Sequence, residues 1–351
     1  MSEPAPRART PSPDLDRRLF ALLDEVGATA NRDQLFEILV SAVGLASDDV
    51  DRLDLKITNA ALKEMRAAFA LFARYRDVPK VTIFGSARTL RDDPLYEQTR
   101  DLAHALAAQG WMVVTGAGPG IMAAGMEGAG LERAIGINIR LPFEQESNPF
   151  IADDKLLSMK YFFTRKLMLM KESAGFAVLP GGFGTLDEAL ELLTLQQTGK
   201  ADPHPIVLLD EVEHGTYWHA WERFFVDEVV SRGYVNHDDD CLYRITDDVA
   251  AAVGEILGFY RNYHSIRFVR DRLVIRLRVL PTDNDLTALN EEFVDICAGG
   301  RIEATAPLPA EVADEDRLEL PRIVLRFDRL HYARLHELIR RLNGMPSVER
   351  L

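Results

Sequence analysis

The residues with the clearest chemical potential lie in one short segment of this 351-residue chain, residues 180–188, which read Pro-Gly-Gly-Phe-Gly-Thr-Leu-Asp-Glu. Glycine lets a backbone approach phosphate oxygens closely, and the free N–H groups at the start of a helix attract an anion. We expect Thr185 at the N-cap, where its hydroxyl serves a phosphate oxygen or the helix itself. Glu188 follows one helical turn later and is expected to face the same ligand-binding opening. Thr185 and Glu188 also match a capping box, in which the two side chains would only cap the helix. The glycines of this turn are Gly181, Gly182 and Gly184.

Two earlier turns also place glycines directly after an apolar stretch. In an open α/β sheet the ligand lies beyond the carboxyl ends of the strands, so all three turns are expected to meet at one site. Each turn alone is equally consistent with a tight connection that needs a positive φ. The second turn does not fit the GxGxxG fingerprint, and the chain has no GxxxxGK[ST] sequence, so ATP hydrolysis has little support. The candidate binding residues in these turns are Gly85, Ser86, Gly116, Gly118, Gly120 and Met122.

Two neighbouring cations, Arg165 and Lys166, stand in a mostly apolar stretch that predicts a helix over residues 162–173. Helix charges are commonly solvated and without a role in chemistry. This helix, however, leads directly into the strand that ends at Pro180. Its Arg165 side chain could therefore reach the site at which the glycine turns are expected to meet.

Strands and helices alternate along the middle of the chain in the way that a doubly wound, Rossmann-like parallel sheet requires. Strands that are apolar along their whole length belong to a sheet covered on both faces. The expected strands cover residues 81–84, 111–115, 134–141, 175–179 and 206–209, and the expected helices cover 96–109, 119–129, 162–173, 186–198 and 218–231.

The chain is expected to divide into four parts. Residues 1–14 form a disordered tail, residues 15–78 a helical leader, and residues 79–262 the Rossmann-like α/β part. Residues 263–351 show a β-α-β-β-α pattern, which is typical of a small ferredoxin-like α+β sandwich with a regulatory or assembly role.

Composition excludes several classes of function. Lys and Arg number 41 against 55 Asp and Glu, a net charge of −14, so binding to a nucleic acid polymer is not expected. No apolar stretch predicts a signal peptide or a membrane span, which favours the cytoplasm. Cys241 and Cys297 are far apart and belong to no CxxC pair, so neither a disulfide framework nor a metal site is predicted.

The combination of Met159, Arg165, Lys166 and residues 180–188 resembles the Lonely Guy (LOG) family, once labelled lysine decarboxylase-like. The PGGxGTxxE motif of that family is matched at every fixed position, and the resemblance covers roughly residues 81–234. The second glycine turn departs slightly, with Ala117 and Pro119 where plainer glycine-rich loops occur. A Ser-x-His-Lys element for pyridoxal phosphate is missing from the sequence, so the decarboxylase label has no support.

The resemblance implies hydrolysis of the N-glycosidic bond of a nucleoside 5′-monophosphate, of the AMP or cytokinin type, to free base and ribose 5-phosphate. Glu188 would act beside the ribose, and Arg165 on either the base or the phosphate. The glycine turns, Met159, Lys166 and Thr185 would bind the substrate without any cofactor. A nucleotide carrier or sensor without turnover is the alternative. The apolar character of residues 162–170 favours a homodimer.

Overall fold

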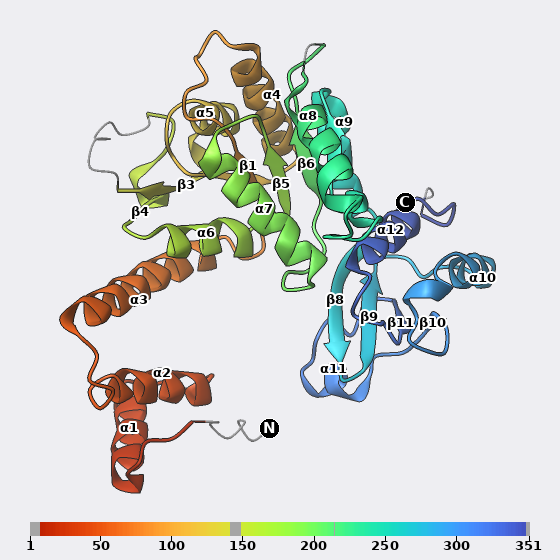
Figure 1. Ribbon diagram of the computed structural model, residues 1–351. Coiled ribbons are helices and arrows are strands. Elements are labelled where there is room, and N and C mark those ends of the chain that lie inside the picture. The colour runs from red at the N-terminus through yellow and green to blue at the C-terminus, as the bar shows by residue number, and fades with distance from the viewer. Residues whose placement is uncertain (1–7, 141–148, 214, 349–351) are drawn as a thin grey trace. The chain divides into compact units, whose positions relative to one another are not determined.

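The structure, a computed structural model, describes residues 8–140, 149–213 and 215–348 (Figure 1). The chain forms two compact units, Met1–Arg66 and Ala67–Leu351, which are described separately below. No helix in the described ranges is long and apolar enough to cross a membrane.

The first unit is helical, as the sequence predicts. It contains α1 (Pro13–Glu25), α2 (Arg32–Gly44) and the first part of α3 (Arg52–Ala73). The rings of Phe20 and Phe36 stack with their centroids 4.2 Å apart and join α1 to α2. The expected tail is too long: residues 1–7 lie outside the described residues, but Ser12 caps α1, which already begins at Pro13.

The second unit is built on a seven-stranded parallel sheet with the order β4-β3-β2-β1-β5-β6-β7. The order reverses between β1 and β5, which is where an open α/β sheet forms its ligand crevice. The predicted doubly wound fold is therefore confirmed. The strands are β1 (Lys80–Phe84), β2 (Met112–Thr115), β3 (Ala134–Ile139), β4 (Leu156–Met159), β5 (Gly175–Val178), β6 (Ile206–Leu209) and β7 (Arg244–Thr246).

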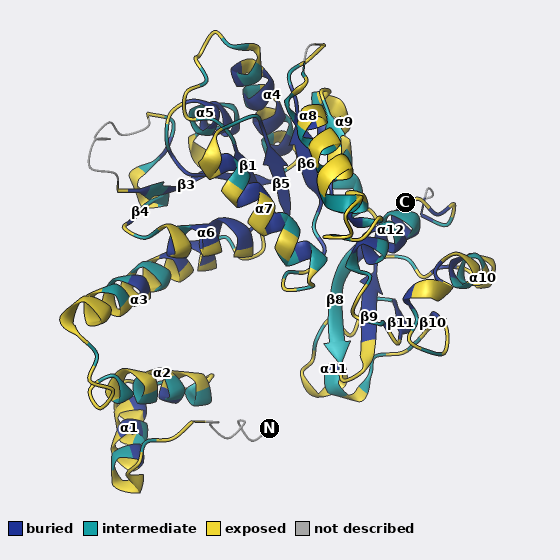
Figure 2. Ribbon diagram, in the orientation of Figure 1, coloured by how far each residue is buried: buried dark blue, intermediate teal, exposed yellow. Residues whose placement is uncertain are grey.

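Helices flank this sheet and bury its central strands, which are dark blue in Figure 2. Val81 and Ile83 of β1 are fully buried in a core that includes Leu102 and Leu106 of α4 and Ile256 of α9. The helices are α4 (Pro94–Ala108), α5 (Ile121–Arg133), α6 (Phe162–Lys171), α7 (Phe183–Gln197), α8 (Tyr217–Phe224) and α9 (Val249–Gly258). Shorter turns are η1 (Asp153–Lys155), the π-helical η2 (Phe225–Val230), η3 (Asp239–Leu242) and η4 (Val294–Ile296).

Three elements of this part were not expected, namely β4, β7 and α9. The two strands are at the edges of the sheet and are half-exposed along most of their length, so they lack the buried apolar pattern of the central strands. The helix expected over residues 218–231 also ends early, because its second half widens into η2. The end of the strand expected over 134–141 lies outside the described residues.

The C-terminal part of this unit contains a four-stranded antiparallel sheet of order β10-β11-β9-β8 with its own apolar core. Its strands are β8 (Tyr263–Val269), β9 (Arg272–Leu277), β10 (Glu303–Ala304) and β11 (Arg322–Leu325), and its helices are α10 (Asp283–Glu292), α11 (Pro309–Ala313) and α12 (Tyr332–Asn343). The expected pattern lacked β8, which is only half-buried. Apart from the short α11, the elements run β-β-α-β-β-α, which is a ferredoxin-like order with its last strand moved to the front.

Candidate functional site

The three glycine turns meet at one cleft of about 790 Å³ beyond the carboxyl ends of β1, β2 and β5. We call it the glycine cleft. Eleven of the fourteen candidate residues line it: Gly85, Ser86, Gly116, Gly118, Met122, Arg165, Gly181, Gly182, Gly184, Thr185 and Glu188. Gly120, Met159 and Lys166 do not line it and lie behind its walls.

Backbone hydrogen bonds join the three turns directly. The N–H of Ser86 donates to the carbonyl of Pro180 at 3.1 Å, and the N–H of Ile121 donates to the carbonyl of Ser86 at 3.0 Å. Gly120 makes this approach possible, because its φ is +65° and a Cβ there would lie 2.3 Å from the Ser86 carbonyl oxygen. Gly120 therefore closes the turns against each other rather than lining the cleft.

The third turn begins its helix earlier than the sequence predicts. Gly182 is the N-cap of α7 and no side chain caps it, so the expectation that Thr185 is the N-cap is wrong. The capping box between Thr185 and Glu188 is wrong for the same reason, because both residues lie inside the helix. The Thr185 hydroxyl instead approaches Gly181, where a Cβ would lie 2.2 Å from its Oγ1.

The start of α7 thus presents glycine backbone and one hydroxyl to the cleft. Free N–H groups at a helix N-terminus bind phosphate without a capping side chain in the way. Tyr217 of α8 fixes the turn from behind, since its hydroxyl donates to the carbonyl of Gly181 at 2.7 Å. No sequence pattern predicts this contact, because it joins residues 36 positions apart.

Glu188 is the buried acid of the cleft. Its side chain is 9 % exposed, and its Oε2 is buried with no hydrogen-bond partner in the part of the chain that the structure describes. Burial raises the pKa of this carboxyl to about 7, against the opposing effect of the cations Lys166 and Arg165. A carboxyl with a pKa near neutrality and an unpaired oxygen is suited to accept a proton from a bound molecule.

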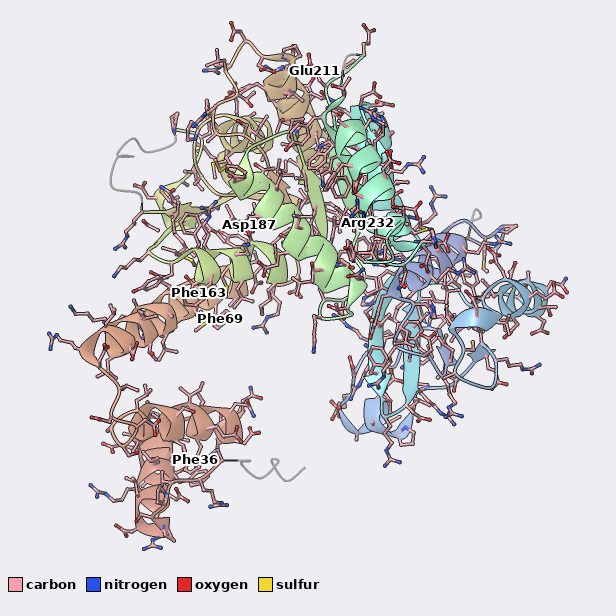
Figure 3. All side chains as sticks on the ribbon, in the orientation of Figure 1. Phe36, Phe69, Phe163, Asp187, Glu211 and Arg232 are labelled. Atoms are coloured by element: carbon pink, nitrogen blue, oxygen red, sulfur yellow. The ribbon has the colours of Figure 1, made fainter. Side chains whose placement is uncertain are left out.

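Lys166 holds the helix that carries this acid. Its Nζ lies 2.6 Å from Oδ2 of Asp187 and 2.8 Å from Oε2 of Glu191, but 4.0 Å from Oε2 of Glu188. Asp187 is labelled on α7 in Figure 3. Lys166 therefore joins α6 to α7 through the two flanking carboxylates and leaves Glu188 without a direct hydrogen bond.

Arg165 reaches the cleft from α6 and fills the space beside the second glycine turn. A Cβ at Gly116 would lie 2.4 Å from Nη2 of Arg165, so only glycine leaves room for the guanidinium there. Arg165 is half-buried, and its positive charge acts on Glu188, as the effect on the pKa of that acid shows. The cleft thus combines a guanidinium group, a carboxyl group with a pKa of about 7, and three glycine turns.

The apolar residues beside Arg165 divide between two faces of α6. Phe162, Phe163 and Leu167 are exposed, because α6 packs through its other face, which carries Met168, Leu169 and Met170. Phe162 lines the cleft together with Phe183, whose side chain is almost fully exposed.

Sequence reasoning missed several residues of the cleft. Asn138 and Ile139 line it at the carboxyl end of β3, and Arg88 lines it just beyond the first glycine turn. Their positions at or just beyond the carboxyl end of a strand could have indicated a binding site, but none of them belongs to a sequence motif. Met159 is buried at the end of β4, where it pairs with Ile139.

The chain is similar in sequence to proteins of known family. The family described as "Possible lysine decarboxylase" matches residues 119–256. A cytokinin riboside 5′-monophosphate phosphoribohydrolase of Mycobacterium tuberculosis is 31% identical over 146 residues, which are 40% of this chain and 74% of that protein. A pyrimidine/purine nucleotide 5′-monophosphate nucleosidase of Escherichia coli is 26% identical over 209 residues, which are 56% of this chain and 44% of that protein.

Among solved structures, the molybdenum cofactor carrier protein of Chlamydomonas reinhardtii is similar at 21% identity and a TM-score of 0.35. The match covers 50% of this chain and 94% of the carrier protein.

Proposed function

The chain belongs to the Lonely Guy (LOG) family, and we propose that it hydrolyses nucleoside 5′-monophosphates, of the AMP or cytokinin type, to free base and ribose 5-phosphate. One observation carries the proposal. Glu188 is buried with an unpaired oxygen in a cleft whose other walls are glycine turns and a guanidinium. Burying an acid without a hydrogen-bond partner lowers stability, so its presence here favours a chemical role.

In this proposal the substrate's phosphate binds at the start of α7. The N–H groups of residues 182–184 and the Thr185 hydroxyl face the cleft there, and the helix dipole favours the negative charge. Anchoring the phosphate fixes the ribose one helical turn away, next to Glu188. Binding energy from the phosphate, which takes no part in the reaction, then contributes to catalysis at the sugar.

Cleavage of the N-glycosidic bond needs charge stabilisation on both sides. As the bond to C1′ breaks, the ribose gains oxocarbenium character, which the Glu188 carboxylate stabilises. The same carboxylate accepts a proton from the water that attacks C1′, and the base leaves with the bonding electron pair and takes up a proton. The Arg165 guanidinium either donates hydrogen bonds to the departing base or holds the phosphate.

A nucleotide carrier or sensor would need the glycine turns but not the buried acid. Incubation with a panel of nucleoside 5′-monophosphates, followed by chromatography for free base, separates the two functions. We expect base release from at least one monophosphate and none from the matching nucleosides, which lack the phosphate. Saturable binding of the panel without any base release would establish a binder instead.

We further propose that the chain forms a homodimer through α6. Its exposed apolar side chains Phe162, Phe163 and Leu167 lie on one helix, and such a patch favours a protein contact. The C-terminal part with the antiparallel sheet is proposed to serve assembly or regulation. Light scattering tests the dimer, and a clean monomer at micromolar concentration would exclude it.

A further inference from the structure

A second cavity, of about 1000 Å³, lies at the amino ends of the parallel strands, whereas the glycine cleft lies at their carboxyl ends. We call it the basic cavity. It opens beside the amino ends of the strands, where Lys80 begins β1 and Trp111 precedes β2. Its far wall comes from the antiparallel sheet, through His264 of β8 and Arg278 just after β9. It shares no lining residue with the glycine cleft.

Positive charge gathers in this cavity, although the whole chain carries a net charge of −14. Five Lys or Arg side chains line it against three carboxylates, and one of these carboxylates, Glu172, is paired with Lys171 at 2.7 Å. The cations are Arg76, Lys80, Lys171, Arg278 and Arg317.

Three of these cations have no carboxylate partner. Arg76, Arg278 and Arg317 form no ion pair within residues 8–140, 149–213 and 215–348. Other arginines of the same antiparallel sheet are paired: Arg276 and Arg322 both contact Glu311. The acidic loop of residues 311–316 therefore neutralises the arginines outside the cavity. Within the cavity, Arg76, Arg278 and Arg317 are exposed, and Nε of Arg278 donates a hydrogen bond to the carbonyl of Tyr260 at 3.2 Å, while their charges are left without a carboxylate partner among the described residues.

Arg278 and Arg317 line this cavity together with His264. Burial lowers the pKa of His264, and the positive charges of Arg317 and Arg278 lower it further. Unpaired arginines around a partly enclosed space favour a multivalent anion, above all phosphate, which accepts the paired donors of a guanidinium.

Aromatic side chains form the rest of the wall. Phe69 and Phe72 of α3, Trp111 and Tyr260 line the cavity next to the cations. Phe72 and Trp111 are buried, and Phe69 and Tyr260 are the more accessible rings. Nζ of Lys171 lies 5.4 Å from the centroid of the Phe69 ring, so a cation already packs against this wall. A flat apolar group of a ligand stacks on the accessible faces of Phe69 and Tyr260. The volume is far larger than an inorganic anion needs and lies at the upper end of the range of small-molecule sites.

The two helices that carry the cleft residues also reach this cavity. α6 holds Arg165 near its start and ends at Lys171, which lines the basic cavity. α7 holds Glu188 near its start, and Gln196 near its end accepts a hydrogen bond from the backbone of His204, another lining residue.

Further hydrogen bonds join Gln196 and His204 to α12 and to Tyr260, which lies between α9 and β8. Gln196 Oε1 pairs with Nε2 of His336 on α12 at 2.9 Å. Nδ1 of His204 pairs with the hydroxyl of Tyr260 at 2.7 Å, and this hydroxyl donates to the carbonyl of Ala174 just before β5. A ligand that moves the cavity wall therefore acts on the far ends of both site-bearing helices.

We propose that the basic cavity binds a small polyanion bearing a flat apolar group, the chemistry of a nucleotide, and that its occupancy alters turnover in the glycine cleft. ATP serves as the probe for anion plus ring, and pyrophosphate as the probe for the anion alone. Binding is measured by calorimetry on the full chain carrying Glu188→Gln, which excludes turnover, in the presence of saturating ribose 5-phosphate, which lacks the flat ring and competes for the glycine cleft.

We expect ATP to bind under these conditions, more tightly than pyrophosphate. The double variant Arg278→Ala/Arg317→Ala should weaken ATP binding at least tenfold. Arg272→Ala is the matched control, because this arginine is exposed at the start of β9 and does not line the cavity. Displacement of ATP by ribose 5-phosphate, equal weakening by Arg272→Ala, or no binding at millimolar ATP would overturn the proposed site.

The coupling has its own readout. With Glu188 intact, ATP should change the rate of base release at least twofold, and the double variant should lose this response while keeping its basal rate. An unchanged rate at saturating ATP would refute the coupling. Because binding is measured without turnover, an inactive enzyme would refute the proposed reaction and leave the test of the cavity intact.

Discussion

Replacing Glu188 by glutamine is expected to abolish base release and, above neutral pH, to stabilise the fold. Glutamine keeps the size of the side chain but can neither accept a proton from water nor carry the negative charge that stabilises the ribose cation. Loss of a general base alone costs about 10²–10⁴-fold in rate, and loss of the charge adds to this. We therefore expect kcat/KM to fall at least about 10³-fold.

The stability change follows from the pKa of the same residue. Burial raises the pKa of Glu188 from 4.5 to about 7, so the folded protein holds a proton that the unfolded chain has lost. The wild-type protein thus loses stability as the pH rises from about 4.5 through about 7, by roughly 3 kcal/mol in total. Glutamine stays neutral and escapes this loss.

Urea unfolding of both proteins at pH 5 and pH 8 measures the effect. The two should have similar free energies of unfolding at pH 5, and Glu188→Gln should be more stable by about 2–3 kcal/mol at pH 8. Glu191→Gln is the matched control, since Glu191 also lies on α7 and contacts Lys166 but is half-exposed. It should keep most of the activity and show no such gain.

Two outcomes would refute this reasoning. If Glu188→Gln retained full activity, the acid would have no role in the reaction. If the variant were less stable than wild type at pH 8, the carboxylate would be paired in the folded protein rather than buried at a cost.

Three further predictions concern the same cleft. Gly181→Ala should reduce kcat/KM at least tenfold, because its Cβ would meet the Thr185 side chain, while Gly182→Ala, with nothing within 4 Å of its Cβ, should fold equally well and serve as the steric control. Tyr217→Phe should lower the free energy of unfolding by about 1 kcal/mol and raise KM, because the Gly181 carbonyl loses its donor; an unchanged KM would show that this bond does not shape the turn. In a pH series, kcat/KM should rise with pH and level off above about 7, where Glu188 is ionised, whereas a fall with rising pH would assign it the role of an acid.

The sequence predicts the centre of the fold better than its edges, for a physical reason. β1, β5 and β6 are buried on both faces and read as continuous apolar runs. β4 and β7 are half-exposed, so hydrogen bonding to a neighbour rather than burial makes them strands. Local sequence carries little information about such edge strands.

The same distinction applies to the site. The glycine turns were predictable because each follows a buried strand, and a parallel sheet brings such turns together. The Tyr217 contact and the unpaired oxygen of Glu188 were not, because both depend on how distant helices pack. The basic cavity is still harder to predict from sequence, because its lining residues, from Arg76 to Arg317, come from distant parts of the chain.

The most direct test of the proposed hydrolysis is the balance of its two products. The purified chain is incubated with the monophosphate that the panel identifies, and free base and ribose 5-phosphate are quantified together over time. We predict that both accumulate in a one-to-one ratio with wild-type protein and that neither appears with Glu188→Gln. Bound but intact nucleotide after prolonged incubation with wild-type protein would contradict the claim and identify the glycine cleft as a binding site only.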